Sequence, residues 1–308
     1  MATLSAGLNP NDVKTAIDSV FDQEFTYRLH PQYATAETPA IFHQSTTDRS
    51  AVIMETFKGG GLWQNKAEEQ DVPKQTPRIG NQRTYTVQEP AGEIEISRDF
   101  KMDDLHGVYE ISIRNFAGRA RDTRDFNAFA LFRNSQTTTL THDGVAFISS
   151  SHTNMNGTTV SNRISAALSE TTISQGIQQL LEMRAQDDVV GGSLAETLLV
   201  PPALFPEAVR QTESVLRPGT GNNDVNYVSA KYGIAVYTSQ FLGLAAGGSD
   251  AACYLLGRNH SIFRWVREGI NTVLVPWQAQ RNNNYLYKGL FRETVGVHNF
   301  EGALGIGA

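Results

Sequence analysis

The chain has 308 residues, of which 40% are hydrophobic and 19% are charged, as in ordinary globular proteins. No stretch approaches the roughly 18 consecutive apolar residues of a membrane helix, and the formal net charge of −6 argues against a protein that grips nucleic acid by neutralising phosphates. Cys253 is the only cysteine, which excludes an internal disulfide framework and fits a reducing compartment. With no basic and apolar leader pattern at the N-terminus, we predict synthesis and folding in the cytoplasm.

The first 50 residues carry little hydrophobic pattern. Asn11 and Asp12 predict the start of a short helix that runs to about Phe25. The stretch from His30 to Asp48 lacks the periodicity of a core element, so we expect an extended arm.

A polar segment at 58–82 contains four glycines and two prolines. A structureless loop of about 25 residues inside a compact domain usually has a function. After it, alternation over 84–88 and 93–96 around Pro90 and Gly92 predicts a β-hairpin. A lone two-stranded ribbon is marginally stable in water, so we expect it to lie on something, with a neighbouring subunit as the natural candidate.

The strongest helix signal begins at Asp103 and Asp104 and continues to about Arg133. Aspartate at a helix N-terminus accepts hydrogen bonds from free backbone N–H groups and favours the positive end of the dipole. About 30 residues at 1.5 Å each predict a spine of roughly 45 Å.

The remaining pattern predicts a mixed chain. A strand and a glycine- and asparagine-rich loop follow at 143–163, and a helix is expected at 170–186, begun by Ser169 or Thr171. We then expect a buried strand at 194–202, a helix at 203–216, and strands at 234–239, 252–257, 272–276 and 285–298. The strands do not alternate with helices in βαβ units, which indicates the α+β class.

No catalytic constellation emerges from the sequence. Gly59-Gly60-Gly61 is not followed by the residues of a phosphate-binding loop, and the signatures GxSxG, HExxH and CxxC are absent. His142, Asp143 and His152 could in principle bind a metal, but a role in organising a loop is the simpler interpretation. Cys253 lies among apolar residues and is expected to be a small buried hydrophobe. We therefore predict no enzyme activity, no metal and no cofactor.

Four phrases in a fixed order carry a resemblance to a known family: ISRDFKMDDLHGVYE at 96–110, DGVAFISSSHTN at 143–154, LLVPPALFPEAVR at 198–210 and YKGLFRETVGVHNFEGALG at 287–305. Together they resemble the major capsid proteins of tailed bacteriophages with the HK97-type fold, and most closely the Mu-like major head subunits.

The resemblance implies a division of the chain. Residues 1–55 would form an N-terminal arm, and residues 56–98 an extended hairpin (the E-loop) that overlaps the next subunit. Residues 99–186 and 271–308 would form a peripheral domain with the spine helix, and residues 187–270 an axial domain.

The resemblance also implies function and partners. The protein would be a structural virion component that self-assembles into hexamers and pentamers of an icosahedral shell, built in the bacterial host cytoplasm. The shell would enclose double-stranded DNA without sequence-specific binding. The expected partners are other copies of the chain, a separate scaffolding protein, a portal and a decoration or cement protein. Too little chain precedes the E-loop for a cleaved scaffolding region, so we predict no cleavage.

Candidate contact residues follow from the E-loop. Leu62 and Trp63 are the expected apolar anchors, since buried aromatic residues often carry interface energy. Arg78 and Arg83 would pair with acids of the neighbour, or else remain solvated charges. Some family members form covalent Lys–Asn cross-links, but lysines such as Lys58, Lys66 and Lys74 are ordinary in a solvated loop, and we predict no cross-link.

Three alternatives remain at this stage. The same fold could form an encapsulin-like nanocompartment around a cargo enzyme. The chain could also be an enzyme of unrecognised type, which a pocket with converging titratable groups would favour, or a minor structural or adhesion protein.

Overall fold

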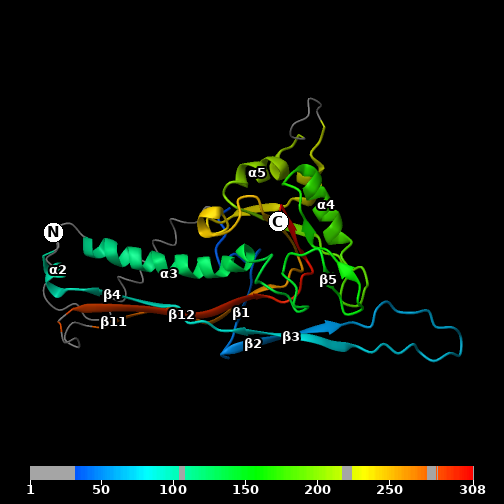
Figure 1. The fold of residues 1–308 in the computed structure, drawn as a ribbon, viewed down its shortest axis with the longest axis horizontal. Coiled ribbons are helices and arrows are strands. Elements are labelled where there is room, and N and C mark those ends of the chain that lie inside the picture. Colours follow the sequence, from blue (N-terminus) through cyan, green and yellow to red (C-terminus); the bar gives the residue numbers. More distant parts are fainter. Residues whose placement is uncertain (1–31, 104–107, 217–223, 276–281, 283, 308) are drawn as a thin grey trace.

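The computed structural model describes residues 32–103, 108–216, 224–275, 282 and 284–307 (Figure 1). Two larger sheets carry the helices, and a two-stranded ribbon extends away from them. Short elements complete the fold: α2 (Arg98–Met102), β5 (His152–Thr153), β6 (Thr159–Val160), η1 (Val228–Tyr232) and η2 (Leu244–Ala246). The chain is α+β, as the sequence predicts.

The first sheet has four strands in the order β1-β11-β12-β4. Its centre is the long antiparallel pair β11 (Ile262–Val275) and β12 (Tyr285–Val297); β1 (His43–Thr46) is parallel to β11, and β4 (Ala91–Ile96) is antiparallel to β12. The helix α3 (Val108–Arg133) runs along this sheet (Figure 1). Its 26 residues span about 39 Å, so the expected spine helix is present.

The second sheet has five strands in the order β7-β13-β10-β8-β9. These strands are β7 (Arg163–Ile164), β13 (Ala303–Ile306), β10 (Cys253–Gly257), β8 (Ala195–Val200) and β9 (Ala235–Thr238). Every residue of β10 and β13 is buried, because these strands lie inside the sheet and are covered on both faces. The helices α4 (Glu170–Leu181) and α5 (Phe205–Glu213) pack on this sheet.

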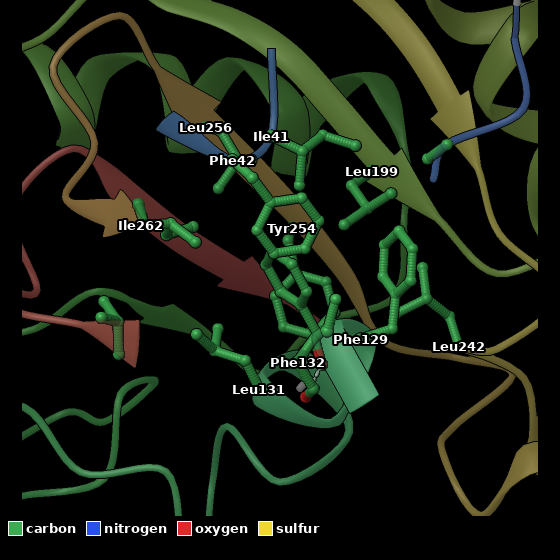
Figure 2. Packing of buried hydrophobic residues seen from close by; sticks show 14 of the residues in the cluster. Ile41, Phe42, Phe129, Leu131, Phe132, Leu199, Leu242, Tyr254, Leu256 and Ile262 are labelled. Carbon is green, nitrogen blue, oxygen red and sulfur yellow. Dashed lines mark hydrogen bonds between the residues drawn. The ribbon is translucent and has the colours of Figure 1, made fainter. Parts of the chain in front are cut away.

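An aromatic core joins the C-terminal end of α3 to both sheets (Figure 2). Phe132 is fully buried and its ring centroid lies 4.9 Å from Tyr254, 6.1 Å from Phe42 and 6.1 Å from Phe129. The Tyr254 hydroxyl donates a 2.7 Å hydrogen bond to the Phe132 carbonyl, which satisfies the one polar group of this tyrosine at the end of the helix. The spine helix is therefore fixed at its C-terminal end.

A second apolar cluster lies between α4, α5 and the five-stranded sheet. Ser169 is the N-cap of α4 and accepts a hydrogen bond from the Thr172 N–H, while the Thr172 hydroxyl accepts one from the Ser169 N–H. Gly176 faces the sheet, where an added Cβ would lie only 3.1 Å from Leu255. The Ser169 cap agrees with the start predicted for this helix, although the helix ends at Leu181 and not near residue 186.

The ribbon consists of β2 (Ala51–Lys58) and β3 (Arg78–Thr86), which pair antiparallel, with residues 59–77 forming its distal loop. Figure 1 shows this loop projecting far from the helices. The hairpin predicted within 84–96 is wrong: β3 pairs with β2, whereas β4 pairs with β12. The alternating patterns were sound, but a local turn does not decide which strands meet.

Two expectations about helix and arm also need correction. Asp103 does not open the spine helix; it is the C-cap of α2, whose N-cap is Ser97, and Asp104 lies outside the described residues. The described part of the expected arm is not an extended surface segment, because Ile41 and Phe42 are fully buried in the aromatic core. The helix expected between Asn11 and Phe25 lies outside the described residues.

The strand expected at 272–276 is the end of the much longer β11, and the expected strand in 143–151 is an irregular loop. β11 alternates between exposed and half-buried residues from Val266 to Val273, because one face meets the α3 side and the other faces solvent. The sheets also cut across the predicted domain ranges. β7 and β13 belong to the five-stranded sheet and α4 packs on it, and the boundary at 270 falls inside β11.

Candidate assembly interface

The base of the ribbon is fixed to its own subunit by side chains on one face. The Tyr85 hydroxyl donates a 2.5 Å hydrogen bond to the Val297 carbonyl, and its ring stacks on Trp265 with centroids 5.3 Å apart. Burial raises the pKa of Tyr85 to about 12, so this hydroxyl remains a donor at physiological pH. The Thr56 hydroxyl lies 3.1 Å from His298 Nε2 and is buried.

Two further bonds connect β3 to the loop that precedes β5. The Asn81 amide donates to the His142 carbonyl at 3.1 Å, and the Arg83 guanidinium donates to the Thr141 carbonyl at 3.2 Å. Burial, the neighbouring His142 and Arg83 lower the pKa of His298, so its ring is held neutral beside Thr56. The ribbon is therefore a fixed projection at its base.

Asp143 and His152 organise the loop on which the ribbon rests. His152 is fully buried, its Nδ1 lies 2.8 Å from Asp143 Oδ2, and its ring stacks on Phe300. Burial disfavours ionisation of Asp143, but hydrogen bonds from His152 and Thr141 outweigh it and hold the pKa of this carboxyl below its ordinary value. These contacts confirm the loop-organising interpretation of the histidine pattern.

The opposite face of the ribbon is exposed and carries three large apolar side chains on either side of the Glu55–Gln82 pair. Ile53, Phe57 and Ile79 lie on this face with exposed fractions of 59%, 65% and 64%, and Phe57 is directly opposite Ile79 in the register. Sequence reasoning missed these three residues, because a strand with one docked and one exposed face reads as an ordinary amphipathic strand. The exposed side can be assigned only when the docked side is known.

The two predicted apolar anchors lie in the distal loop. Leu62 is 74% and Trp63 is 92% exposed, and Val72 beside them is 71% exposed. Single exposed apolar residues are common, but a tryptophan exposed to this degree beside two aliphatic residues is typical of a contact surface.

The two predicted arginines differ in their surroundings. Arg78 is exposed at the start of β3, opposite Lys58 in the register. Arg83 is half-buried and already bonded to Thr141 of its own subunit. The four predicted contact residues therefore do not form one cluster: Leu62 and Trp63 share the tip, Arg78 lies at the end of the ribbon strands and Arg83 at their base.

The structure shows the surroundings of the cysteine and of the possible metal ligands that the sequence offers. Cys253 is fully buried, and burial raises the pKa of its thiol to about 12, as expected for a small buried hydrophobe. Among the described residues, no group of three or more histidine, cysteine, aspartate or glutamate side chains is placed to hold a metal ion. Within the same part of the chain, no helix has the length and apolarity needed to cross a membrane.

A buried ion pair supports the four-stranded sheet beside α3. Arg264 donates to Glu293 Oε2 through Nε at 2.8 Å and through an Nη at 2.6 Å. Burial raises the pKa of Glu293, although Arg264 opposes this shift. Arg124 of α3 contacts Glu37 at 2.5 Å in the same region, so these charges connect the helix, the sheet and the N-terminal segment.

The fold matches the folds of solved phage and particle capsid structures. It matches a structure described as Microbacterium phage Oxtober96 with a TM-score of 0.56 and 12% identity, covering 98% of this chain and 99% of that one. It also matches the mature capsid of bacteriophage PhiM1 with a TM-score of 0.57 and 13% identity, covering 89% of this chain and 87% of that one. The capsid of a native GTA particle matches with a TM-score of 0.56 and 14% identity, covering 89% of this chain and 91% of that one. These likenesses establish the HK97-type fold.

The family model described as "Phage capsid protein" matches residues 81–306. The chain therefore belongs to the phage capsid protein family, and it is a structural capsid subunit of the major capsid protein type. No curated protein matches the sequence. The narrower likeness to Mu-like head subunits stays a prediction.

Proposed function

We propose that the protein is the major head subunit that assembles into hexamers and pentamers of an icosahedral shell around double-stranded phage DNA, without sequence-specific contacts to that DNA. Assembly takes place in the host cytoplasm with a separate scaffolding protein and a portal, and a decoration or cement protein binds the finished shell. Membership of the phage capsid family supports the shell role. The comparisons do not favour the encapsulin-like alternative, and the protein has no enzymatic role in this proposal.

The observation that carries the assembly mechanism is the contrast between the two ends of the ribbon. Its base is fixed by four side-chain contacts to its own subunit, whereas Leu62 and Trp63 at its tip are exposed. A rigid arm with an apolar tip suits a contact made outside its own subunit. Many such contacts add up in a closed shell, because each one raises the effective concentration for the next.

The division into arm, E-loop, peripheral domain and axial domain is also a proposal. Sheet membership supports a modified division in which α4, β7 and β13 join the axial domain and all of β11 joins the peripheral domain. The ribbon of β2 and β3 with its loop then corresponds to the E-loop. Arg78 remains the candidate for an ion pair with an acidic residue of the neighbouring subunit. Arg83 is already bonded to Thr141 of its own subunit.

Expression of the chain with its scaffolding protein tests the proposal, with particle mass measured by light scattering and shape by negative-stain imaging. We expect closed shells or capsomers. The double variant Leu62→Ala/Trp63→Ala should raise the concentration needed for assembly at least tenfold, because burying such side chains contributes about 1.5–3 kcal/mol each and about 1.4 kcal/mol is a factor of ten.

The control is Gln64→Ala, which removes a polar side chain from the same exposed loop and should leave the assembly concentration within about twofold. A wild-type chain that stays monomeric with scaffold present contradicts the shell function. Normal assembly of the Leu62→Ala/Trp63→Ala variant removes the anchors from the proposal but leaves the shell function intact.

A further inference from the structure

Two buried histidines lie at the base of the ribbon, on the two segments that hold it. His298 follows β12, and its Nε2 lies 3.1 Å from the Thr56 hydroxyl of β2. His142 precedes β5, and its backbone carbonyl accepts the hydrogen bond from the Asn81 amide of β3. The two imidazole rings have centroids 5.9 Å apart, and both residues are more than nine-tenths buried. The His142–His298 pair therefore contacts both strands of the ribbon.

Each ring of this pair has one nitrogen with a partner and one without. His142 Nδ1 lies 3.2 Å from the His298 carbonyl, and His298 Nε2 contacts Thr56. The other two nitrogens, His142 Nε2 and His298 Nδ1, are buried and have no hydrogen-bond partner among the described residues. A charged imidazolium carries N–H groups on both nitrogens, so a proton added to either ring creates a buried donor without an acceptor. The pair is therefore suited to its neutral form.

A third histidine of the same loop has the opposite arrangement. His152 Nδ1 lies 2.8 Å from the Asp143 carboxylate, so a proton on His152 has a negative partner. The same carboxylate also accepts hydrogen bonds from the Thr141 hydroxyl at 2.6 Å and from the Val145 N–H at 3.1 Å. Asp143 is thus already engaged, and it does not serve the His142–His298 pair.

The charged groups that act on His298 are basic. Burial first, then the neighbouring His142 and Arg83, lower the pKa of His298, and only the Glu55 carbonyl opposes them. Among the described residues, no carboxylate offsets these basic groups at His298. Other titratable groups on the surrounding segments are engaged elsewhere, namely Glu55 with Gln82, Lys58 with Asn156, Tyr85 with Val297, Glu293 with Arg264, Glu301 with Gln186 and His260 with His43.

We propose that the His142–His298 pair is a pH-sensitive switch, which holds the ribbon base in neutral solution and releases it in mildly acidic solution. A proton on His298 places an uncompensated charge and an unpaired N–H in a buried site beside Arg83. The ring reaches water only by leaving Thr56, and that movement opens the contact between β2 and the end of β12. The switch belongs to the single subunit and goes beyond the proposed shell function.

Hydrogen–deuterium exchange of the unassembled subunit at pH 7 and pH 5 tests the switch, with each rate divided by the intrinsic exchange rate at that pH. The open form binds the proton with the ordinary histidine pKa of about 6.5, whereas the closed form binds it less well, so acid favours opening. Protection of the β2 and β3 amides should fall about 3- to 25-fold, and the upper value applies when the closed form takes up no proton. His298→Gln keeps a polar group beside Thr56 but takes up no proton, so it should lose most of this fall.

The control is His260→Gln, because His260 is also a buried histidine but contacts Ala40 and His43 and not the ribbon. Its β2 and β3 amides should respond to acid as those of the wild type do. An equal response in wild type and His298→Gln, or loss of the response in His260→Gln, overturns the inference and leaves the shell function standing.

If His298→Gln does not fold, hydrogen–deuterium exchange at the histidine ring carbon Cε1 of the wild-type subunit decides. Peptide mass spectrometry of this exchange against pH gives the titration midpoint of His298 alone. The midpoint should lie below 6.5, with the loss of ribbon protection in the same pH range. A midpoint of 6.5 or above, or ribbon opening in a different pH range, overturns the switch.

Discussion

Gly296 in β12 lies directly under the Tyr85 ring that fixes the ribbon. A Cβ built at Gly296 would fall inside the van der Waals envelope of the Tyr85 ring carbons. Tyr85 cannot yield without losing its stack on Trp265 and its hydrogen bond to the Val297 carbonyl. The substitution Gly296→Ala should therefore weaken the attachment of the ribbon base while leaving the aromatic core intact.

The expected cost follows from the two contacts that are lost. An aromatic stack and a hydrogen bond together contribute about 1–3 kcal/mol. This cost applies to local opening of the ribbon and not to global unfolding, because the ribbon lies outside the apolar clusters. In hydrogen–deuterium exchange of the unassembled subunit, the β2 and β3 amides should therefore exchange roughly 5- to 150-fold faster.

Gly269→Ala is the control, because a Cβ added at that glycine of β11 meets no heavy atom within 4 Å among the described residues. Its ribbon exchange should equal that of the wild type. The double variant Gly296→Ala/Tyr85→Ala should resemble Tyr85→Ala alone, since the clash has been removed. Unchanged ribbon exchange in Gly296→Ala, or equal acceleration in Gly269→Ala, would refute the reasoning.

Three further predictions concern the subunit itself. Phe132→Ala should lower the free energy of unfolding, measured in urea, by about 3–5 kcal/mol because it empties the centre of the aromatic core. Phe126 on the same helix is half-exposed, so Phe126→Ala should lower this free energy clearly less. Equal losses for the two variants would contradict the role of this core. Ser169→Ala should cost about 1 kcal/mol in the same assay through loss of the α4 N-cap, and Ser169→Asp should retain most of the stability. Burial and the stacked His43 lower the pKa of His260 to about 4, so the unfolded state binds more protons than the folded one between pH 4 and the ordinary value of 6.5. The stabilising effect of a neutral His260 is complete above pH 6.5 and is lost as the pH falls toward 4. In His260→Gln the free energy of unfolding should depend less on pH in this window, and an unchanged slope would contradict the assignment to His260.

Much of the architecture could be predicted from the sequence because it depends on local pattern. The start of α4 at Ser169, the buried strand before Pro201, the long helix ending near Arg133 and the class of the fold all follow from caps, breakers and hydrophobic periodicity. The exposed loop with Leu62 and Trp63 followed from composition, since a long polar segment with glycines does not pack into a core. The order of four phrases indicated the family, which the match over residues 81–306 confirms.

What only the tertiary structure decided is which segments meet. Alternation over 84–88 predicts a strand but not its partner. β3 pairs with β2 across a loop of 19 residues (59–77) and not with the nearby β4. Ile41 and Phe42 lie in a stretch without periodicity, yet they are fully buried, because a single turn can place two side chains in a core that other elements enclose. Gly92 and Gly289, which pair in the register under the Phe116 ring, likewise lie 197 residues apart in the chain. Local pattern fixes where elements begin and end, whereas pairing and burial depend on long-range contacts between residues that share no local signal.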